Sequence, residues 1–354
     1  MGSSFVQILL VVFIGIAPGL QDASTTDPRI TELNALMQKG QFLKVLNKGR
    51  AILHDQPNQP QSLMLTGAAC IELARTIKDT NAKHQAYAEA ENLFQRFSLV
   101  HPNHNNSKVE QSLARCCLIR KDWKNAIQHA DKSIQLSPSS SMAHRILGEA
   151  LTGNQQHEKA LQTLKKALAF SPRDTSIMHL IQGEYHTLRK YAEGLSFLLK
   201  QQDNLPQSAQ LKSQFYNTLY TAYISLNDIE NAQIAITKAI TLNPKEAKFA
   251  PEMALNLYRL GRSEDSKLWA EKALGYSHLK TKPKAICLRI LGQLLSHEGK
   301  YQEALNFLEK SYRFNPQDRS TGFAIVAALR RTGQNEKAKE LIKKINANHA
   351  DPRE

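Results

Sequence analysis

Residues 123–138 read WKNAIQHADKSIQLSP, and residues 301–316 read YQEALNFLEKSYRFNP. Each stretch begins with an aromatic residue and ends in proline, and between them alanine, an apolar or small residue and serine recur at equal spacing. Residues 157–172 and 229–244 keep the same order of positions. Spacings of three and four residues place these positions on one helical face, and the proline ends the helix because it lacks an N–H. The chain is therefore predicted to consist of repeated helical units.

A second motif precedes these helices. It is present as Leu147-Gly148-x2-Leu151, Leu219-Tyr220-x2-Tyr223 and Leu291-Gly292-x2-Leu295. Aligned on the alanine and proline positions, nine units start near residues 26, 60, 107, 141, 175, 213, 247, 285 and 319. Five of the eight steps between these starts are 34 residues long. One 47-residue step predicts an insertion around residues 76–87, and two 38-residue steps predict longer turns near 206–210 and 277–282.

Together the two motifs resemble the tetratricopeptide repeat family over almost all of the chain. The resemblance implies an all-α fold, a right-handed α-solenoid of about nine helical hairpins that bury their apolar faces by stacking. Small residues are expected where the two helices of a hairpin cross closely: Ala126, Ala160, Ala232, Ala304 and Ala338. The predicted boundaries are a signal peptide or signal-anchor at 1–19, a linker at 20–28, the solenoid at 29–346 and a polar tail at 347–354.

The N-terminal segment is typical of an export signal. The first 21 residues contain no charged side chain, and residues 5–16 form an apolar run followed by Ala17-Pro18-Gly19. An apolar run followed by a small-x-small triplet is the layout of a secretory signal, although here no Lys or Arg precedes it. We predict an exported protein, periplasmic or secreted. The alternative is a membrane tether through residues 5–20, which are short for a span of ~20 residues.

The charge balance bears on the partner. Among 354 residues, 46 are Lys or Arg and 32 are Asp or Glu, which gives a net charge of +14. An apolar content of 42% excludes wholesale disorder and a multi-span membrane protein. The positive charges are spread along the chain without an aromatic–basic stripe, so nucleic acid is not an expected partner. The excess of positive charge favours an acidic peptide or polymer instead.

No motif for catalysis is present. The sequence lacks the common nucleophile, phosphate-binding, dinucleotide-binding and zinc-binding patterns. We therefore predict no catalytic residue, no metal site, no cofactor and no enzymatic activity. The four cysteines, Cys70, Cys116, Cys117 and Cys287, are expected as buried core residues rather than as a disulfide framework.

The resemblance also implies where a partner would bind. In this family the first helices line a concave groove, with outward side chains at the second, fifth, sixth, ninth, twelfth and thirteenth positions of each unit. The candidate groove residues are Lys108, Gln111, Arg115, Arg145, Glu149, His179, His186, Asn217, Thr221 and Arg289. No unit combines lysine at the fifth position with asparagine at the ninth, the pair carried by members that clamp the C-terminal carboxylate of chaperones. A co-chaperone role is therefore not expected.

These observations predict a non-enzymatic scaffold or adaptor for protein–protein interactions in the cell envelope. By analogy with the family, it would support the assembly of a secretion, pilus or polysaccharide-export system. One alternative is a membrane-tethered adaptor that recruits a soluble acidic partner. Another is an enzyme with an unrecognised site, which predicts a compact pocket with convergent titratable groups.

Overall fold

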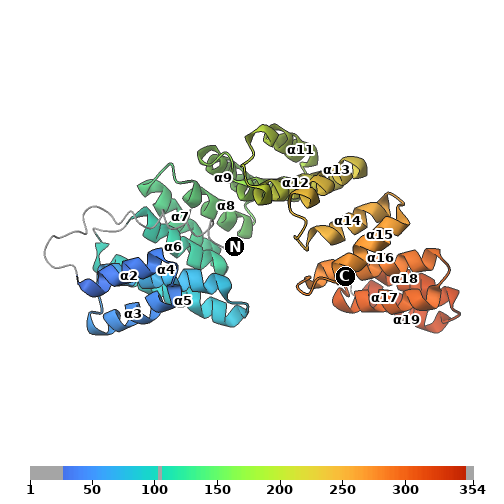
Figure 1. Ribbon diagram of the computed structural model, residues 1–354, viewed down its shortest axis with the longest axis horizontal. Helices are drawn as coiled ribbons and strands as arrows, with labels where there is room; N and C mark the ends of the chain where they lie inside the picture. The colour runs from blue at the N-terminus through green and yellow to red at the C-terminus, as the bar shows by residue number, and fades with distance from the viewer. Residues whose placement is uncertain (1–26, 103–105, 348–354) are drawn as a thin grey trace. The chain divides into compact units, whose positions relative to one another are not determined.

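A computed structural model describes residues 27–102 and 106–347, and within these ranges it contains 18 α-helices and no β-strand. The helices alternate as the first and second helix of nine hairpins (Figure 1). The first helices are α2 (Pro28–Gln38), α4 (Pro60–Thr76), α6 (Ser107–Ile119), α8 (Ser141–Gly153), α10 (Thr175–Thr187), α12 (Ala209–Ser225), α14 (Phe249–Arg259), α16 (Thr281–His297) and α18 (Arg319–Arg331). The second helices are α3 (Phe42–Asp55), α5 (Thr80–Val100), α7 (Trp123–Leu136), α9 (His157–Phe170), α11 (Tyr191–Lys200), α13 (Ile229–Leu242), α15 (Ser263–Leu274), α17 (Tyr301–Phe314) and α19 (Asn335–Ala347), and a 3-10 turn, η2 (Gln202–Asn204), follows α11.

The prediction of an all-α fold of about nine helical hairpins is confirmed. The signal or anchor segment at 1–19 lies outside the described residues, as do most of the linker and all but the first residue of the tail. The helices group into two compact units, residues 1–188 and 189–354. In each unit the second helix of one hairpin packs on the first helix of the next, as α7 packs on α8 and α17 on α18. A single continuous solenoid from 29 to 346 stays a prediction.

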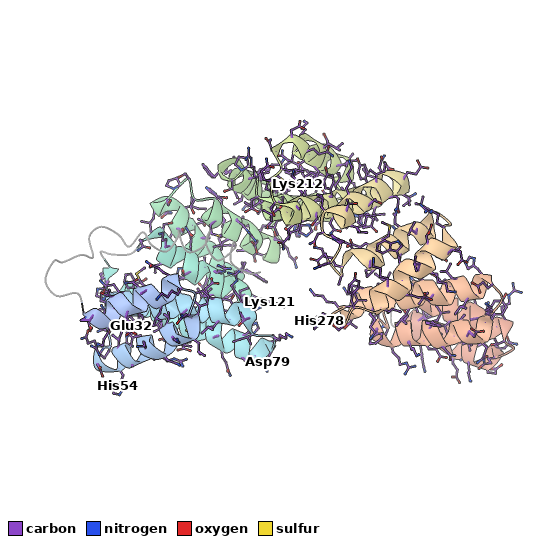
Figure 2. All side chains as sticks on the ribbon, viewed as in Figure 1. Glu32, His54, Asp79, Lys121, Lys212 and His278 are labelled. Atoms are coloured by element: carbon purple, nitrogen blue, oxygen red, sulfur yellow. The ribbon has the colours of Figure 1, made fainter. Side chains whose placement is uncertain are left out.

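The turn between the two helices has one backbone conformation in eight of the nine hairpins. One residue of each such turn has a positive φ between 57° and 78°. These residues are Gly40, Lys121, Gln155, Arg189, Asn227, Gly261, Gly299 and Gly333. At Lys121 (labelled in Figure 2), the N–H bonds Leu118 O at 3.1 Å and the next N–H, of Asp122, bonds Cys117 O at 2.9 Å. This left-handed cap satisfies the last carbonyls of the first helix and turns the chain back.

Small residues lie at the helix crossings, as the repeat spacing predicts. Ala126, Ala160, Ala232 and Ala304 are fully buried, and Ala338 is 1% exposed. Gly148 and Gly292 lie opposite leucines of the second helix: a Cβ atom on Gly148 would lie 2.6 Å from Leu164 Cγ, and one on Gly292 would lie 2.6 Å from Leu308 Cγ. The helices therefore approach so closely that one added methyl group would displace a core leucine.

Two glycines of the first unit give a matched test of this packing. Both lie inside first helices, but a Cβ atom on Gly183 would meet nothing within 4 Å. We expect Gly183→Ala to raise the free energy of unfolding by about 0.5–1 kcal/mol, because alanine loses less backbone entropy than glycine on folding. Gly148→Ala is expected to lower it by about 1–2 kcal/mol, because overpacking outweighs that gain. Urea denaturation of both variants checks this, and a change of the same sign in both would contradict it.

The inserted residues lengthen both helices and turns. The extra residues near 206–210 and 277–282 supply the first turns of α12 and α16, each of which is 17 residues long. The connections before these two helices, residues 201–208 and 275–280, are also longer than the connections at 137–140, 171–174 and 315–318, so longer turns are present there as predicted. Around residues 76–87 the insertion is mostly helical, because α4 runs to Thr76 and α5, at 21 residues, begins at Thr80. Each addition continues an existing backbone hydrogen-bond ladder.

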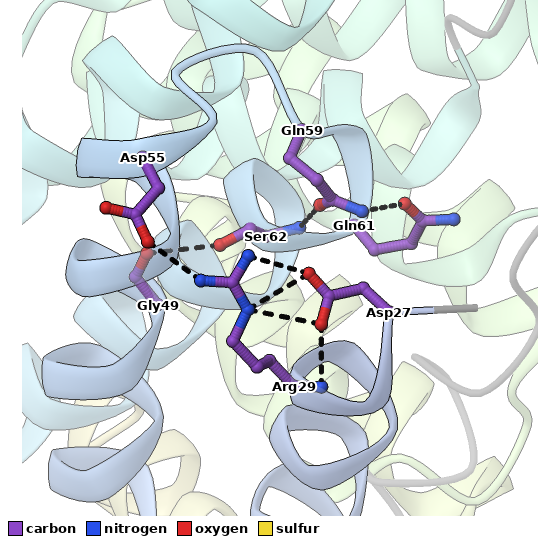
Figure 3. A network of polar contacts seen from close by, with 7 residues as sticks. All are labelled: Asp27, Arg29, Gly49, Asp55, Gln59, Gln61 and Ser62. Carbon is purple, nitrogen blue, oxygen red and sulfur yellow. Dashed lines mark hydrogen bonds and ion pairs between the residues drawn. The ribbon is translucent and has the colours of Figure 1, made fainter. Parts of the chain in front are cut away.

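A polar network ties the first hairpin together at the start of the described chain (Figure 3). The Arg29 guanidinium lies 2.8 Å from Asp27 Oδ2 and 2.8 Å from Asp55 Oδ2, so it joins the start of α2 to the end of α3. The Arg29 hydrogen bonds lower the pKa of both carboxyl groups. Nearby, Ser62 of α4 donates to Gly49 O of α3 at 3.1 Å.

Candidate functional site

The predicted groove residues of the first unit lie on α6, α8 and α10. Helix α6 contacts α8, and α8 contacts α10, so these three first helices form one surface. Gln111 connects two of them, because its Nε2 donates to Ser107 Oγ at 3.1 Å and to Ser140 Oγ, before α8, at 3.0 Å. Lys108 is half-buried in the first turn of α6, and burial lowers the pKa of its ammonium group.

The charged residues of this surface differ in their pairing. Arg145 and Glu149 lie one turn apart on α8 and form an ion pair at 2.8 Å. Arg115 is half-buried on α6. Burial raises the pKa of the Tyr87 hydroxyl, and the positive charge of Arg115 opposes this rise. His179 and His186 are both exposed on α10. The surface thus presents exposed or half-buried polar side chains, but one arginine is already neutralised locally.

The remaining three candidates lie in the second unit. Asn217 on α12 is 9% exposed, and its Oδ1 atom has no hydrogen-bond partner among the described residues. Thr221, one turn later, donates to Thr218 O of its own helix at 2.7 Å. Arg289 on α16 is largely buried, with Nε 3.3 Å from Asp318 Oδ2 and Nη1 3.3 Å from Gln293 Oε1. The structure therefore divides the candidate residues between two units, with seven in the first and three in the second.

The sequence reasoning missed one buried carboxylate. Glu252 lies in the first turn of α14, and its Oε2 atom is buried without a hydrogen-bond partner in the described part of the chain. Burial raises the pKa of Glu252 to about 7, against the opposing charge of Lys248 and with a smaller contribution from Glu246. Tyr220 of α12 donates to the main-chain oxygen of Glu252 at 3.3 Å, which links α12 to the first turn of α14. The sequence does contain a signal for this residue. Glu252 is an acidic residue at the sixth position of its unit, where the other outward positions carry cationic or neutral residues.

Two surface cavities lie elsewhere. One, of about 320 Å³, is lined by residues of α17, α18 and α19, including Tyr312, Arg313 and Leu341. The other, of about 510 Å³, lies against α11 and is lined mainly by apolar residues such as Leu195, Leu199 and Leu226. Ser196 and Lys200 of α11 also line this second cavity, one helical turn apart.

The cysteines are core residues. Cys70, Cys116, Cys117 and Cys287 are free and buried, which confirms the predicted core placement. Burial raises the pKa of Cys70, Cys117 and Cys287 to about 12, and it raises the pKa of Cys116 as well. Their thiols therefore stay protonated at neutral pH, which suits packing rather than reactivity.

Between residues 27 and 102 and between 106 and 347, no three His, Cys, Asp or Glu side chains gather closely enough to hold a metal ion. Among the described helices, none combines the length and apolar character that crossing a bilayer requires.

Family models match three parts of the chain, each described as tetratricopeptide repeat. They cover residues 122–175, 214–246 and 295–354. The matched segments lie in both compact units.

Two curated proteins are similar over part of their length. The "Protein STIP1 homolog" of Dictyostelium discoideum is 23% identical over 224 residues, which is 61% of this chain and 31% of that protein. The "BBSome complex member BBS4" of Mus musculus is 26% identical over 129 residues, or 36% of this chain and 24% of that protein. The matched regions thus span about a third and a quarter of these two relatives.

Solved structures share the fold at low identity. Yeast Tom70 has a TM-score of 0.57 at 16% identity, covering 94% of this chain and 69% of that one. The structure of "APC/C hetero-tetramer Cut9-Hcn1" has a TM-score of 0.56 at 15% identity, covering 91% and 58%. Pseudomonas aeruginosa pilF has a TM-score of 0.51 at 19% identity, covering 61% and 94%. These likenesses concern the arrangement of the helices.

Proposed function

We propose that this chain is a tetratricopeptide repeat protein. On this premise, it is a non-enzymatic scaffold that binds partner proteins on the surfaces formed by the first helices of its hairpins. One observation carries the proposal. The contacting first helices α6, α8 and α10 expose or half-expose polar side chains at equivalent repeat positions, such as Gln111, Arg145 and His179. Such a surface offers directional hydrogen bonds and charge to an extended partner.

The partner we propose for the first unit is an acidic segment of another protein. The net charge of +14 attracts such a segment over a distance, and Lys108 and Arg115 provide cationic groups on α6. The most direct test is crosslinked affinity purification from the native host, followed by identification of the captured proteins. Crosslinks that map to first helices support the proposal, and crosslinks confined to second helices would contradict the assigned surface.

Arg115 gives a defined prediction. We expect Arg115→Glu to weaken binding of a short, labelled poly-glutamate peptide by about fivefold at low salt, because an attraction becomes a repulsion at a half-exposed site. The loss should shrink at high salt, where such interactions are screened. Fluorescence anisotropy measures the affinity, and circular dichroism verifies the fold. Lys337→Glu on the exposed face of α19 is the matched control; an equal loss there would show that net charge alone holds the peptide.

We further propose that the protein acts in an exported context, in the assembly of a secretion, pilus or polysaccharide-export system. The support is the uncharged N-terminal segment, with its apolar run at 5–16 and the small residues Ala17 and Gly19. N-terminal sequencing of the protein from its host tests this. A mature chain that starts after Gly19 or Ala23 supports cleavage, whereas an intact Met1 in the membrane fraction favours a tethered adaptor.

A further inference from the structure

Asn217 of α12 and Glu252 of α14 each carry a buried polar atom without a hydrogen-bond partner among the described residues, and we call this pair the Asn217–Glu252 site. Asn217 is nine-tenths buried, and its Oδ1 atom has no hydrogen-bond partner among the described residues, which is costly for a buried acceptor. The buried Oε2 atom of the Glu252 carboxyl group likewise has no hydrogen-bond partner among the described residues. Two such atoms on α12 and α14, which the Tyr220 hydrogen bond links, point to a ligand that supplies the missing partners.

The two groups lie within one compact unit and on connected helices. Tyr220 lies one turn after Asn217, on the same face of α12. Its hydroxyl donates to the main-chain oxygen of Glu252 at 3.3 Å, so a hydrogen bond links the helix that carries Asn217 to the residue that carries the unpartnered carboxyl oxygen. On the next first helix, Arg289 already lies close to Asp318 and Gln293.

The chemistry of each group selects a different part of a ligand. An amide side chain both donates and accepts, so Asn217 can pair with a main-chain peptide group. A buried carboxyl oxygen needs a donor, and a lysine or arginine group supplies both a donor and a charge. Lys248 does not fill this role, because its Nζ lies 5.3 Å from the Phe249 ring centroid and the Glu252 Oε2 atom remains without a hydrogen bond.

We propose that the Asn217–Glu252 site binds an extended segment of a partner protein that carries a lysine or arginine, with the cationic group on Glu252 and the segment's main chain on Asn217. The inference rests on the proposed binding function and deepens it, because it gives the second unit a ligand chemistry opposite to the acidic one proposed for the first. Packed helices lie about 8–10 Å apart and an extended chain advances about 3.3 Å per residue. A segment of about six residues therefore spans from α12 to α16.

The test uses the full chain and arrays of extended peptides about nine residues long. The central residue is lysine, arginine, glutamine or glutamate, and the flanking positions are random mixtures of uncharged residues. We expect the wild-type chain to bind peptides with a central lysine or arginine about tenfold or more tightly than those with glutamine. Glu252→Gln should reduce this ratio to about one. Asn217→Ala should weaken all four classes together and keep the ratio.

The control is Glu264→Gln, which removes an exposed carboxylate from α15 in the same unit and should leave the ratio unchanged. Circular dichroism and thermal melting verify that each variant folds. Equal binding of all four classes, a preference for glutamate, or a preserved ratio in Glu252→Gln would overturn this inference alone. If no peptide binds any part of the chain while crosslinked partners are also absent, the proposed binding function fails with it.

Discussion

Replacing Phe94 with alanine is expected to lower the free energy of unfolding by about 4 kcal/mol. Phe94 of α5 is fully buried, and its ring lies against Gly67 of α4, where an added Cβ atom would lie 3.0 Å from ring carbons. Because Gly67 has no side chain that can move into the space, the cavity left by the ring cannot collapse easily. Urea denaturation followed by circular dichroism at 222 nm, a helix-sensitive wavelength, measures the change.

Phe323→Ala is the matched control for this substitution. Phe323 of α18 is 44% exposed, and its ring faces the Arg319 guanidinium at 5.8 Å. The same deletion there is expected to cost less than about 1 kcal/mol, because most of its ring area is not removed from water on folding. Equal losses for the two variants would show that the α4–α5 contact is not a well-packed core.

Replacing Glu252 with glutamine is expected to stabilise the protein at about pH 8 by about 2 kcal/mol and to leave its stability at about pH 4 unchanged. The pKa of Glu252 is raised to about 7 in the folded chain from an ordinary value of 4.5. Between these values the folded state keeps a proton that the unfolded state has released. Stability contributed by this group therefore falls as the pH rises from about 4.5 to about 7, by at most about 3 kcal/mol.

Glutamine cannot ionise, so the variant avoids this loss. Urea denaturation of the wild type and the variant across this pH range measures the difference between their free energies of unfolding. Groups that titrate alike in both proteins cancel in this difference. The charged and titratable groups that act on Glu252 are Lys248 and Glu246, with the Tyr220 hydroxyl bonded to its main chain. Glu264→Gln, on the exposed surface, should show a flat difference. A flat difference for Glu252→Gln would mean that its carboxyl group is solvated.

The helical hairpins follow from the sequence because every copy repeats the same packing constraint. Ala126 and Ala304 occupy one crossing geometry, so the spacing alone predicts their burial. The inserted residues have no such template. Residues 209–212 and 281–284 extend helices because their neighbours already provide hydrogen-bonding turns, a consequence that the repeat period does not contain.

The candidate site is less predictable, because a repeat position specifies a face and not a depth. Gln111 and Asn217 both occupy the fifth position of a unit. Gln111 is half-buried and bonded to two serine hydroxyls, whereas Asn217 is buried without a hydrogen bond to its Oδ1 atom. The difference comes from the side chains of neighbouring helices, which vary between units. The same reasoning explains why Glu252 was overlooked.

The left-handed turn shared by eight hairpins also bears on how such a chain evolves. Because the turn is closed by hydrogen bonds within its own first helix, as at Lys121, it does not depend on which hairpin comes before or after. A duplicated or deleted 34-residue segment therefore arrives with a complete connection of its own. Where the turn has glycine, as at Gly261 and Gly299, the copy carries no backbone strain. Recombination can thus change the number of hairpins, and with it the number of first helices that the chain exposes, without inventing a new loop.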